Sequence, residues 1–396
     1  MFTWKNKIRI AKGICLKSNP LYVQFYITAR CNLTCEQCNI IYANSDVREC
    51  RLDEIEKIAA NLSKVGVAIV LLTGGEPFVR KDLPEIVRAF HRQGIHVRMQ
   101  TNGLASEEAL AACVKYGGND ISISLDSLRS EVQDSINGQF AGSWKKALET
   151  IAKVTRHLPK KRSFAAFGCV LSPHNLEDVE EVIRFGTAIG WHTSLVPIHI
   201  THKTKPMNFR TYDQHLAFQP EDYPRVDALM DKFKKMKREG FLIYDSDEYL
   251  ENIKTFVRND PISWRRHNDD VCDSPKMYFA IIPNGDFAVC CDHRLPGGKV
   301  PTQSVNFPEI YRSREFRDRA VQVAKACEGC MFGSYPEITI TARYWEATLE
   351  RLTVFLEKPP PRPWPLTPER LAEIASDIRA QKNQPVDAAQ LMRRYA

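Results

Sequence analysis

Three cysteines near the start of the chain have the spacing of a cluster-binding loop. Cys31, Cys35 and Cys38 form the pattern C-x3-C-x2-C directly after a β-rich run. Three thiolates on so short a loop can bind one face of a 4Fe–4S cubane, and thiolate is the ligand that iron–sulfur chemistry prefers. Zinc is the alternative, but a structural zinc site needs four protein ligands and no nearby histidine or cysteine supplies the fourth. A three-cysteine set leaves one iron open to an exogenous ligand.

Further cysteines fall late in the chain, and their grouping also suggests a metal. They are Cys272, Cys290, Cys291, Cys327 and Cys330. The first residues lack the apolar core of a secretory signal, so we expect reduced thiols rather than disulfides. Two pairs of thiolates suit tetrahedral zinc as well as iron–sulfur, and the spacing alone leaves both open. The scattered cysteines are typical of inert buried thiols; they are Cys15, Cys50, Cys113 and Cys169.

The elements that must position these residues alternate between β-rich runs and helical periodicity. Strands are expected at residues 21–28, 68–73, 96–101, 120–125, 163–170 and 193–200. Helices are expected between them at residues 52–65, 82–93, 106–116, 144–157 and 176–189. Strands joined by right-handed helical crossovers form a parallel sheet, so the predicted fold class is α/β.

Polar runs stand at the ends of four of these strands. The first strand is followed by CNLTCEQC, the second by TGGEP, the third by QTNG and the fourth by SLDS. In parallel α/β folds the carboxyl ends of the strands meet at one edge, and chemistry gathers there. The sequence therefore predicts one site at that edge of the sheet.

The three-cysteine loop followed by Gly74-Gly75-Glu76-Pro77 resembles the radical S-adenosylmethionine (radical SAM) superfamily. The resemblance implies a partial (β/α)6 TIM-like barrel of parallel strands. It also implies a 4Fe–4S cluster whose open iron chelates the amino and carboxylate groups of S-adenosylmethionine. In this family the two glycines let the backbone approach the cofactor, while Glu76 and neighbouring carbonyls accept from the methionine ammonium.

The same resemblance assigns roles to polar residues at the third and fourth strand ends. Gln100 and Asn102 match positions that face the ribose or lie near it. Ser124 and Asp126 match positions at the ribose and the methionine carboxylate. Capping of the strand ends is the alternative role for all four. Two departures from the family pattern leave the adenine stack and the carboxylate partner unassigned: Gln37 replaces a frequent aromatic residue, and Asn137-Gly138 replaces a frequent Arg–Gly.

The late cysteines are similar to the short C-terminal extension called the twitch domain in radical SAM enzymes. The resemblance implies a small α+β cysteine-rich domain that holds an auxiliary 4Fe–4S cluster. The implied ligands are Cys272, Cys290, Cys327 and Cys330. A structural zinc ribbon is the alternative, and Cys291 is expected to be a buried thiol, although it could replace Cys290 as a ligand.

The resemblance implies an enzyme, an oxidoreductase or a transferase, that reductively cleaves S-adenosylmethionine to a 5′-deoxyadenosyl radical and abstracts hydrogen from its substrate. We expect a small or amphiphilic substrate, two-electron oxidation aided by the auxiliary cluster, and a reducing partner such as flavodoxin or ferredoxin. Redox-neutral chemistry (adenosyl addition, epimerisation or rearrangement) with a structural second metal site is one alternative. Modification of a ribosomal peptide is another. A metal-binding scaffold without activity is disfavoured, because structure alone needs no open iron.

Composition and charge exclude several classes of protein. The 396 residues are 43% hydrophobic and 26% charged, as in an ordinary globular protein. No apolar run approaches the roughly 20 residues that cross a membrane, so no membrane span is expected. The net charge of +7 is a mild excess spread along the chain and does not indicate nucleic-acid binding. We therefore expect a cytoplasmic protein.

Pattern divides the chain into five segments. A basic amphipathic segment (1–20) precedes the barrel (21–200), a linker and helical region (201–270), the auxiliary domain (271–335) and C-terminal helices with a proline-rich connection (336–396). A hairpin is expected at 278–290, and helices are expected at 225–239, 313–326, 344–356 and 368–382, the last of which closes the chain. Five polar residues at and beyond the sixth strand could line a substrate cavity, or they could simply form an exposed polar loop. They are His199, His202, Lys203, Lys205 and Arg210.

Two helical stripes of apolar residues are expected to pack as core. The stripe in the first segment consists of Trp4, Ile8, Ala11 and Cys15 among basic residues. Packing on the barrel is the favoured role, although a basic amphipathic helix of this kind can touch a membrane surface. The stripe in the late helix consists of Trp345, Leu349, Leu352 and Leu356.

Overall fold

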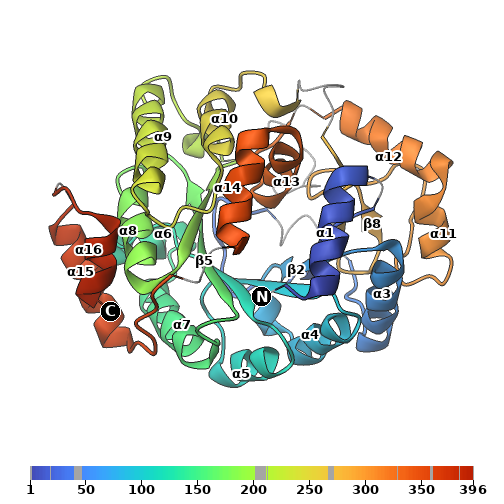
Figure 1. Cartoon of the computed structure of the whole chain (residues 1–396), viewed down its shortest axis with the longest axis horizontal. Coiled ribbons are helices and arrows are strands. Elements are labelled where there is room, and N and C mark those ends of the chain that lie inside the picture. The colour runs from blue at the N-terminus through green and yellow to red at the C-terminus, as the bar shows by residue number, and fades with distance from the viewer. Residues whose placement is uncertain are drawn as a thin grey trace.

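The chain folds around one curved sheet whose strands are almost all parallel (Figure 1). The structure, a computed structural model, describes residues 2–17, 19–39, 47–200, 211, 213–265, 272–327, 329–356, 360–382 and 384–395. The strands are β1 (Tyr22–Thr28), β2 (Ile69–Gly74), β3 (His96–Thr101), β4 (Asp120–Ser124), β5 (Phe164–Leu171), β6 (His192–Pro197), β7 (Tyr278–Ile281) and β8 (Phe287–Ala288). Their order across the sheet is β6-β5-β4-β3-β2-β1-β7-β8.

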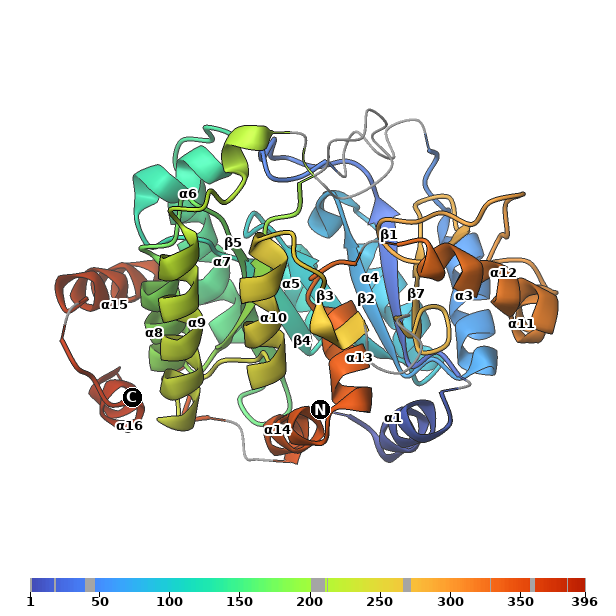
Figure 2. The same cartoon turned by 90° about the horizontal axis from the view of Figure 1, so that it is seen from above.

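The predicted α/β fold is confirmed, with the first six strands within a few residues of their expected bounds. The crossover helices are α3 (Leu52–Val65), α4 (Leu83–Arg92), α5 (Glu107–Lys115), α6 (Ser130–Ile136), α7 (Ser143–His157) and α8 (Val179–Ile189). All but α6, which lies at the carboxyl edge, cover the convex face of the sheet, as Figure 2 shows. Short α6 was not expected, because its seven residues are too few to show a clear helical period.

Alternation along the strands separates a packed face from a polar inner face. On β1, Val23, Phe25 and Ile27 are fully buried under the crossover helices. On the inner face Tyr22, Tyr26 and Leu71 are buried in a second cluster. Other side chains on this face are small or polar and half-buried; they include Gln24, Gln100, Ser122, Ser124, Gly168 and Ser194. Because successive side chains on a strand point to opposite faces, the period of two that predicts the strands also fixes which residues line the barrel.

The predicted hairpin is present as β7 and β8, and it extends the main sheet. Strand β7 pairs in parallel with β1, with Tyr22 opposite Tyr278, and β8 returns antiparallel to β7. Phe279 is fully buried, and its ring lies 5.0 Å from that of Phe287 and 5.5 Å from that of Tyr311. The sheet therefore continues from the barrel into the cysteine-rich segment.

Beyond β6 the chain is mostly helical. The helices are α9 (Tyr223–Arg238), α10 (Asp247–Val257), α11 (Phe307–Arg312), α12 (Arg314–Lys325), α13 (Ser334–Arg343), α14 (Trp345–Leu356), α15 (Pro368–Ala380) and α16 (Ala388–Tyr395). Helices α10, α11, α13 and α16 were not predicted, and α15 does not close the chain. In α13 the alternating run Ile338-Thr339-Ile340-Thr341 has the period of a strand, but tertiary packing makes it a helix with Tyr335 and Ile340 buried.

The N-terminal helix packs on the barrel as expected, but not through its apolar stripe. Helix α1 (Trp4–Leu16) lies against the N-terminal ends of the strands through its opposite face. There the Asn6 side chain donates to the Ala68 and Gly94 carbonyls at 3.1 and 2.8 Å, and Arg9 donates to the Val67 carbonyl at 2.9 Å. These polar bonds turn the apolar stripe outward, so that Trp4 is 76% exposed and Ile8 is 46% exposed.

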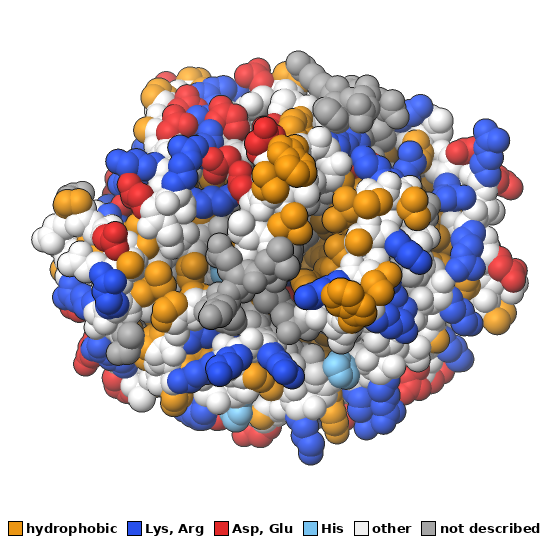
Figure 3. All heavy atoms as spheres, viewed as in Figure 1, with side chains coloured by type: hydrophobic (Ala, Val, Ile, Leu, Met, Phe, Trp, Pro, Cys, Tyr) orange, Lys and Arg blue, Asp and Glu red, His pale blue; other side chains and the backbone are white. Residues whose placement is uncertain are grey.

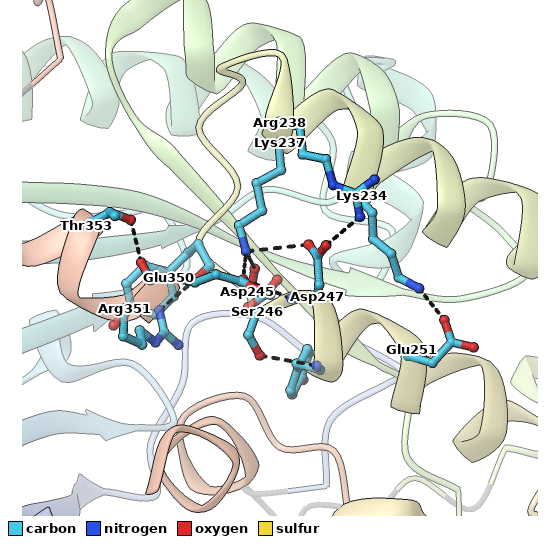
Figure 4. A network of polar contacts seen from close by, with 12 residues as sticks. Lys234, Lys237, Arg238, Asp245, Ser246, Asp247, Glu251, Glu350, Arg351 and Thr353 are labelled. Carbon is cyan, nitrogen blue, oxygen red and sulfur yellow. Dashed lines mark hydrogen bonds and ion pairs between the residues drawn. The ribbon is translucent and has the colours of Figure 1, made fainter. Parts of the chain in front are cut away.

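The expected core stripe of the late helix is also exposed. Trp345, Leu349 and Leu352 on α14 face solvent, while Glu350 and Arg351 face the protein. Figure 4 shows Lys237 of α9 between the Asp245 carbonyl, at 2.7 Å, and the Glu350 carboxylate. Ion pairs therefore fix the orientation of α14. The side chain of Leu356 lies outside the described residues.

If the hairpin is part of the main core, a cavity in it must destabilise the whole chain. We predict that Phe279→Ala lowers the free energy of unfolding by about 3–5 kcal/mol, because it removes a fully buried ring. Urea unfolding followed by circular dichroism measures this change. The control is Val305→Ala, at a side chain that is 79% exposed, which should change stability by less than about 0.5 kcal/mol. A Phe279→Ala variant as stable as this control would contradict the continuous core.

Candidate functional site

The three-cysteine loop lies directly beyond the end of β1, at the carboxyl edge of the sheet. The sulfur of Cys31 accepts from the backbone N–H of Leu33 at 3.4 Å and from the side-chain amide of Asn102 at 3.6 Å. A turn bond from the Cys38 N–H to the Cys35 carbonyl, 3.1 Å, brings the second and third cysteines together. Hydrogen bonds to sulfur are typical of thiolates that bind iron–sulfur clusters.

The Gly74-Gly75 pair allows the turn after β2 to touch the backbone that leads into this loop. The N–H groups of Gly75 and Glu76 donate to the Thr28 and Arg30 carbonyls at 2.9 and 2.8 Å. A Cβ on Gly74 would lie 2.2 Å from the Thr28 oxygen, and one on Gly75 would lie 2.1 Å from the Arg30 oxygen. Gly74 also has φ of +151°, which side-chain-bearing residues rarely adopt. Only glycines fit here.

Glu76 ties the second strand end to the third. Its fully buried carboxylate accepts from the backbone N–H of Asn102 at 2.7 Å and from that of Phe78 at 2.9 Å. Burial raises the pKa of Glu76 to about 7, although these two N–H groups favour the ionised form. A ligand cation placed beside Glu76 would relieve the cost of ionisation.

The fourth strand end reaches the cysteine loop through Asp126. Its buried carboxylate accepts from the Val170 N–H at 2.6 Å and from the Gln37 amide at 3.2 Å. Burial raises the pKa of Asp126 to about 6. Ser124 lies half-buried on the inner face of the barrel. The Gln37 position, where an aromatic residue was expected from the family, thus links the loop to β4.

On the neighbouring third strand, Gln100 is also half-buried on the inner face. The Thr73 hydroxyl donates to its side-chain oxygen at 3.4 Å. Gln100 therefore lies beside the end of β2, near the Gly74-Gly75 turn.

Asn137-Gly138, which stands where Arg–Gly was expected, lies directly against the cysteine loop. The Cys35 thiol donates to the side-chain oxygen of Asn137 at 3.7 Å. Gly138 has φ of +80°, and a Cβ on it would lie 2.4 Å from the Thr34 hydroxyl. The pair therefore supports the loop through close backbone contact and supplies no cation for a carboxylate.

The electrostatics of the loop suit a bound metal cluster. Burial raises the pKa of the Cys31 thiol. Burial also raises the pKa of the Cys35 thiol, and the negative charges of the neighbouring Cys38 and Asp126 raise it further. Grouped thiolates repel one another unless a cation neutralises them, and iron would do so. Cys31, Cys35 and Cys38 therefore fit the three protein ligands of a 4Fe–4S cluster.

The late cysteines also gather, together with a histidine that the sequence analysis overlooked. His293 bonds to the Cys327 thiol, and this bond raises the pKa of His293 to about 9. The charges of Cys290 and Cys327 act on Cys272, whose pKa burial raises to about 11. Cys330 lies near enough to Cys327 and Cys290 for their charges to raise its pKa beyond the effect of burial. The run Cys290-Cys291-Asp292-His293 was the available signal.

Cys291 is 3% exposed and belongs to a buried cluster with Tyr22, Tyr26 and Tyr335. This location agrees with the buried thiol expected for it. Within the described part of the chain, no three His, Cys, Asp or Glu side chains are drawn together closely enough to hold a single metal ion.

His199 neither lines an open cavity nor stands in an exposed loop. It is 4% exposed, and its Nε2 accepts from the Met331 N–H at 2.9 Å. Its Nδ1 therefore carries the proton and donates to the Pro197 carbonyl at 2.7 Å. The ring stacks on Phe332 with centroids 3.6 Å apart. His199 joins the end of β6 to the segment after Cys330. The other candidates for lining the cavity, His202, Lys203, Lys205 and Arg210, lie outside the described residues.

Comparison with known proteins agrees with this geometry. The model of the family described as "Radical SAM superfamily" matches residues 25–186. A PqqA peptide cyclase from Rhodopseudomonas palustris is 33% identical over 322 residues, which are 79% of this chain and 80% of that protein. The chain belongs to the radical SAM superfamily.

Two further similarities extend the comparison. A probable GTP 3′,8-cyclase from Thermococcus kodakarensis is 29% identical over 270 residues, 67% of this chain and 82% of that protein. The crystal structure of Streptococcus suis SuiB bound to precursor peptide SuiA matches with a TM-score of 0.56 at 16% identity, covering 86% of this chain and 78% of that one. The structural likeness shows a shared fold.

The chain is therefore an enzyme that uses a 4Fe–4S cluster and S-adenosylmethionine. When bound, the cluster would supply the electron for reductive cleavage of S-adenosylmethionine, and Cys31, Cys35 and Cys38 would hold it. The protein's own part is to hold the cysteine loop in place through Gly74-Gly75, Asn102 and Gln37. Glu76 and Asp126 place buried carboxylates beside that loop.

The close backbone contact at Gly75 should be necessary for cofactor binding. We predict that Gly75→Ala lowers the affinity for S-adenosylmethionine at least about tenfold, because the added Cβ overlaps the Arg30 carbonyl and displaces the cysteine loop. Equilibrium binding to anaerobically reconstituted protein measures this loss. Gly142→Ala is the control, since its φ is also positive but no atom lies within 4 Å of the added Cβ. Equal binding by the two variants would show that the contact is dispensable.

The raised pKa of Glu76 predicts a pH dependence of stability. The folded pKa, about 7, exceeds the ordinary value of 4.5, so between these pH values the folded state holds more protons. The contribution of Glu76 to the free energy of unfolding is therefore fully present below pH 4.5 and is lost as the pH rises through about 7. The loss amounts to a few kcal/mol. We predict that the cofactor-free wild type loses more stability from pH 5 to pH 8 than Glu76→Gln. Urea unfolding at both pH values measures this difference, and parallel pH profiles would contradict the prediction.

Proposed function

We propose that this enzyme abstracts hydrogen from its substrate and oxidises it by two electrons, with an auxiliary 4Fe–4S cluster as acceptor of the second electron. One observation carries the proposal. Cys38 of the first site and Cys290 of the late site pack against the same buried cluster, which contains Tyr26 and Cys291. The two groups of thiols thus flank one patch of core, and the second lies near the barrel in which a substrate radical would form.

The proposed reaction balances in electrons and protons. The 5′-deoxyadenosyl radical removes one hydrogen atom and leaves as 5′-deoxyadenosine. The substrate radical then loses one electron to the auxiliary centre and one proton to solvent or a base, so the product is lighter by two hydrogens. Cys272, Cys290, Cys327 and Cys330 are the proposed auxiliary ligands. A reductant such as flavodoxin or ferredoxin would supply the first electron.

A small or amphiphilic molecule is the proposed substrate, and the half-buried polar residues Gln24, Ser122 and Ser194 inside the barrel support it. A peptide is the second candidate, because the PqqA peptide cyclase is similar over most of both chains. The alternative reaction is redox-neutral, with a structural second metal site.

Removal of auxiliary ligands separates the two reactions. We predict that Cys272→Ala/Cys290→Ala lowers the iron content by about four per chain, since one cubane is lost. Product that is lighter by two hydrogens should disappear while 5′-deoxyadenosine still forms. Cys113→Ala, which removes a buried thiol behind β3, is the control and should keep both activities. Unchanged product formation would refute the electron-acceptor role. So would a variant that loses one zinc per chain, relative to wild type, instead of four irons.

A further inference from the structure

Large exposed apolar side chains gather on two helices. Among the described residues, Trp4, Ile8 and Leu16 on α1 and Trp345, Leu349 and Leu352 on α14 are exposed, and Val305 alone stands elsewhere. The two tryptophans are 76% and 67% exposed. Exposed apolar residues that stand singly are common, whereas a group on one face marks an interaction surface.

Both helices lie along the edge of the sheet formed by the N-terminal ends of the strands, opposite the cysteine loop. Helix α1 bonds to Ala68 and Gly94, which precede β2 and β3. Figure 1 shows both helix axes running side by side across this face, and in Figure 2 the two helices are the outermost elements on that side. The space-filling view of the same face shows orange apolar groups over both helices, with blue cationic groups beside those over α1 and red acidic groups beside those over α14 (Figure 3). We call this face the α1–α14 face.

Both helices have the reverse of the usual polarity. A helix on a globular protein normally turns its apolar stripe inward and its polar side to water. Here Asn6 and Arg9 hold α1 to the protein, while Glu350 and Arg351 hold α14. Arg351 donates to the Tyr244 carbonyl at 2.7 Å and pairs with Glu337 at 3.1 Å. The outward apolar side is thus fixed by specific polar bonds on the inward side.

The charge around the outward stripe of α1 has one sign, whereas α14 has an exposed acidic residue, Glu346, in its first turn. Helix α1 contains no acidic residue. On the helical wheel, exposed Lys5 and Lys12 flank the stripe on one side and exposed Lys7 flanks it on the other. Lys160, Lys161 and Arg162, also exposed, precede β5 and so add to the positive charge at the same edge of the sheet.

We propose that the α1–α14 face docks on an anionic lipid bilayer. A basic helix with tryptophan on its apolar side lies in the lipid interface, where the ring inserts among headgroups and the lysines meet acidic lipids. A second copy of this chain that placed its α1 against α1 would present the same cations and be repelled, which favours lipid as the occupant of the α1 side of the face. None of the described helices is long and apolar enough to cross a bilayer, so the contact is peripheral. Docked in this way, the protein would keep its cysteine loop turned away from the lipid.

Vesicle sedimentation tests this proposal on the full-length, anaerobically reconstituted enzyme. We expect the wild type to bind phosphatidylcholine vesicles that contain phosphatidylglycerol at least about tenfold more tightly than vesicles of phosphatidylcholine alone. Trp4→Ala/Trp345→Ala and Lys5→Glu/Lys7→Glu/Lys12→Glu should each weaken the binding at least about tenfold, since they remove insertion and charge separately. Raising the ionic strength from about 0.1 M to about 1 M shortens the Debye length from about 10 to about 3 Å and should release the wild type.

Val305→Ala and Arg314→Glu are the matched controls, because they change an exposed apolar side chain and an exposed cation that lie outside the two helices. Both should bind vesicles as the wild type does. Iron content and circular dichroism equal to wild type confirm that each variant is folded. Equal binding to both kinds of vesicle, or equal loss in variants and controls, would overturn the proposal. So would a dimer in light scattering that Trp4→Ala/Trp345→Ala dissolves while no vesicle binding is seen.

Discussion

The close approach of two backbone segments determines where this enzyme's chemistry can occur. The turn after β2 lies against the residues between β1 and the cysteine loop, and hydrogen bonds from Gly75 and Glu76 hold the segments together. A side chain at Gly74 or Gly75 would overlap backbone oxygens, which cannot move without breaking the start of the loop. The position of Cys31 therefore depends on two residues that have no side chain.

Buried carboxylates around the loop give the site its electrostatic character. The side chains of Glu76 and Asp126 are both buried, and burial raises the pKa of each toward neutrality. Backbone N–H groups of Asn102, Phe78 and Val170 hold them in place. A buried carboxylate is costly to ionise when no cation lies beside it. Rigidly held carboxylates of this kind therefore suit a cationic ligand such as an amino group, whose charge offsets that cost. The two carboxylates are thus held in place by the protein before any ligand binds.

The carboxyl edge and the N-terminal edge of the sheet have different roles. At the carboxyl edge, loops from four strands converge on thiols, and β7 carries the sheet on into the segment that holds the late cysteines. At the opposite edge, α1 and α14 use their polar residues to bind the protein and leave apolar residues outside. Separation of the edges lets a surface contact and a radical reaction coexist on one chain, because neither covers the other.

Local periodicity in the sequence was sufficient for the six barrel strands and for the crossover helices other than α6, and the spacing of Cys31, Cys35 and Cys38 predicted a cluster-binding loop. These features rest on alternation and on spacing over a few residues. Only the tertiary structure showed that the hairpin joins β1, that His199 bonds to Met331 and that His293 bonds to Cys327. It also turned the stripes of Trp4 and Trp345 outward. An amphipathic pattern shows that a helix has two unlike faces, but which face meets the protein depends on partners such as the Ala68 carbonyl and Lys237, which are remote in sequence.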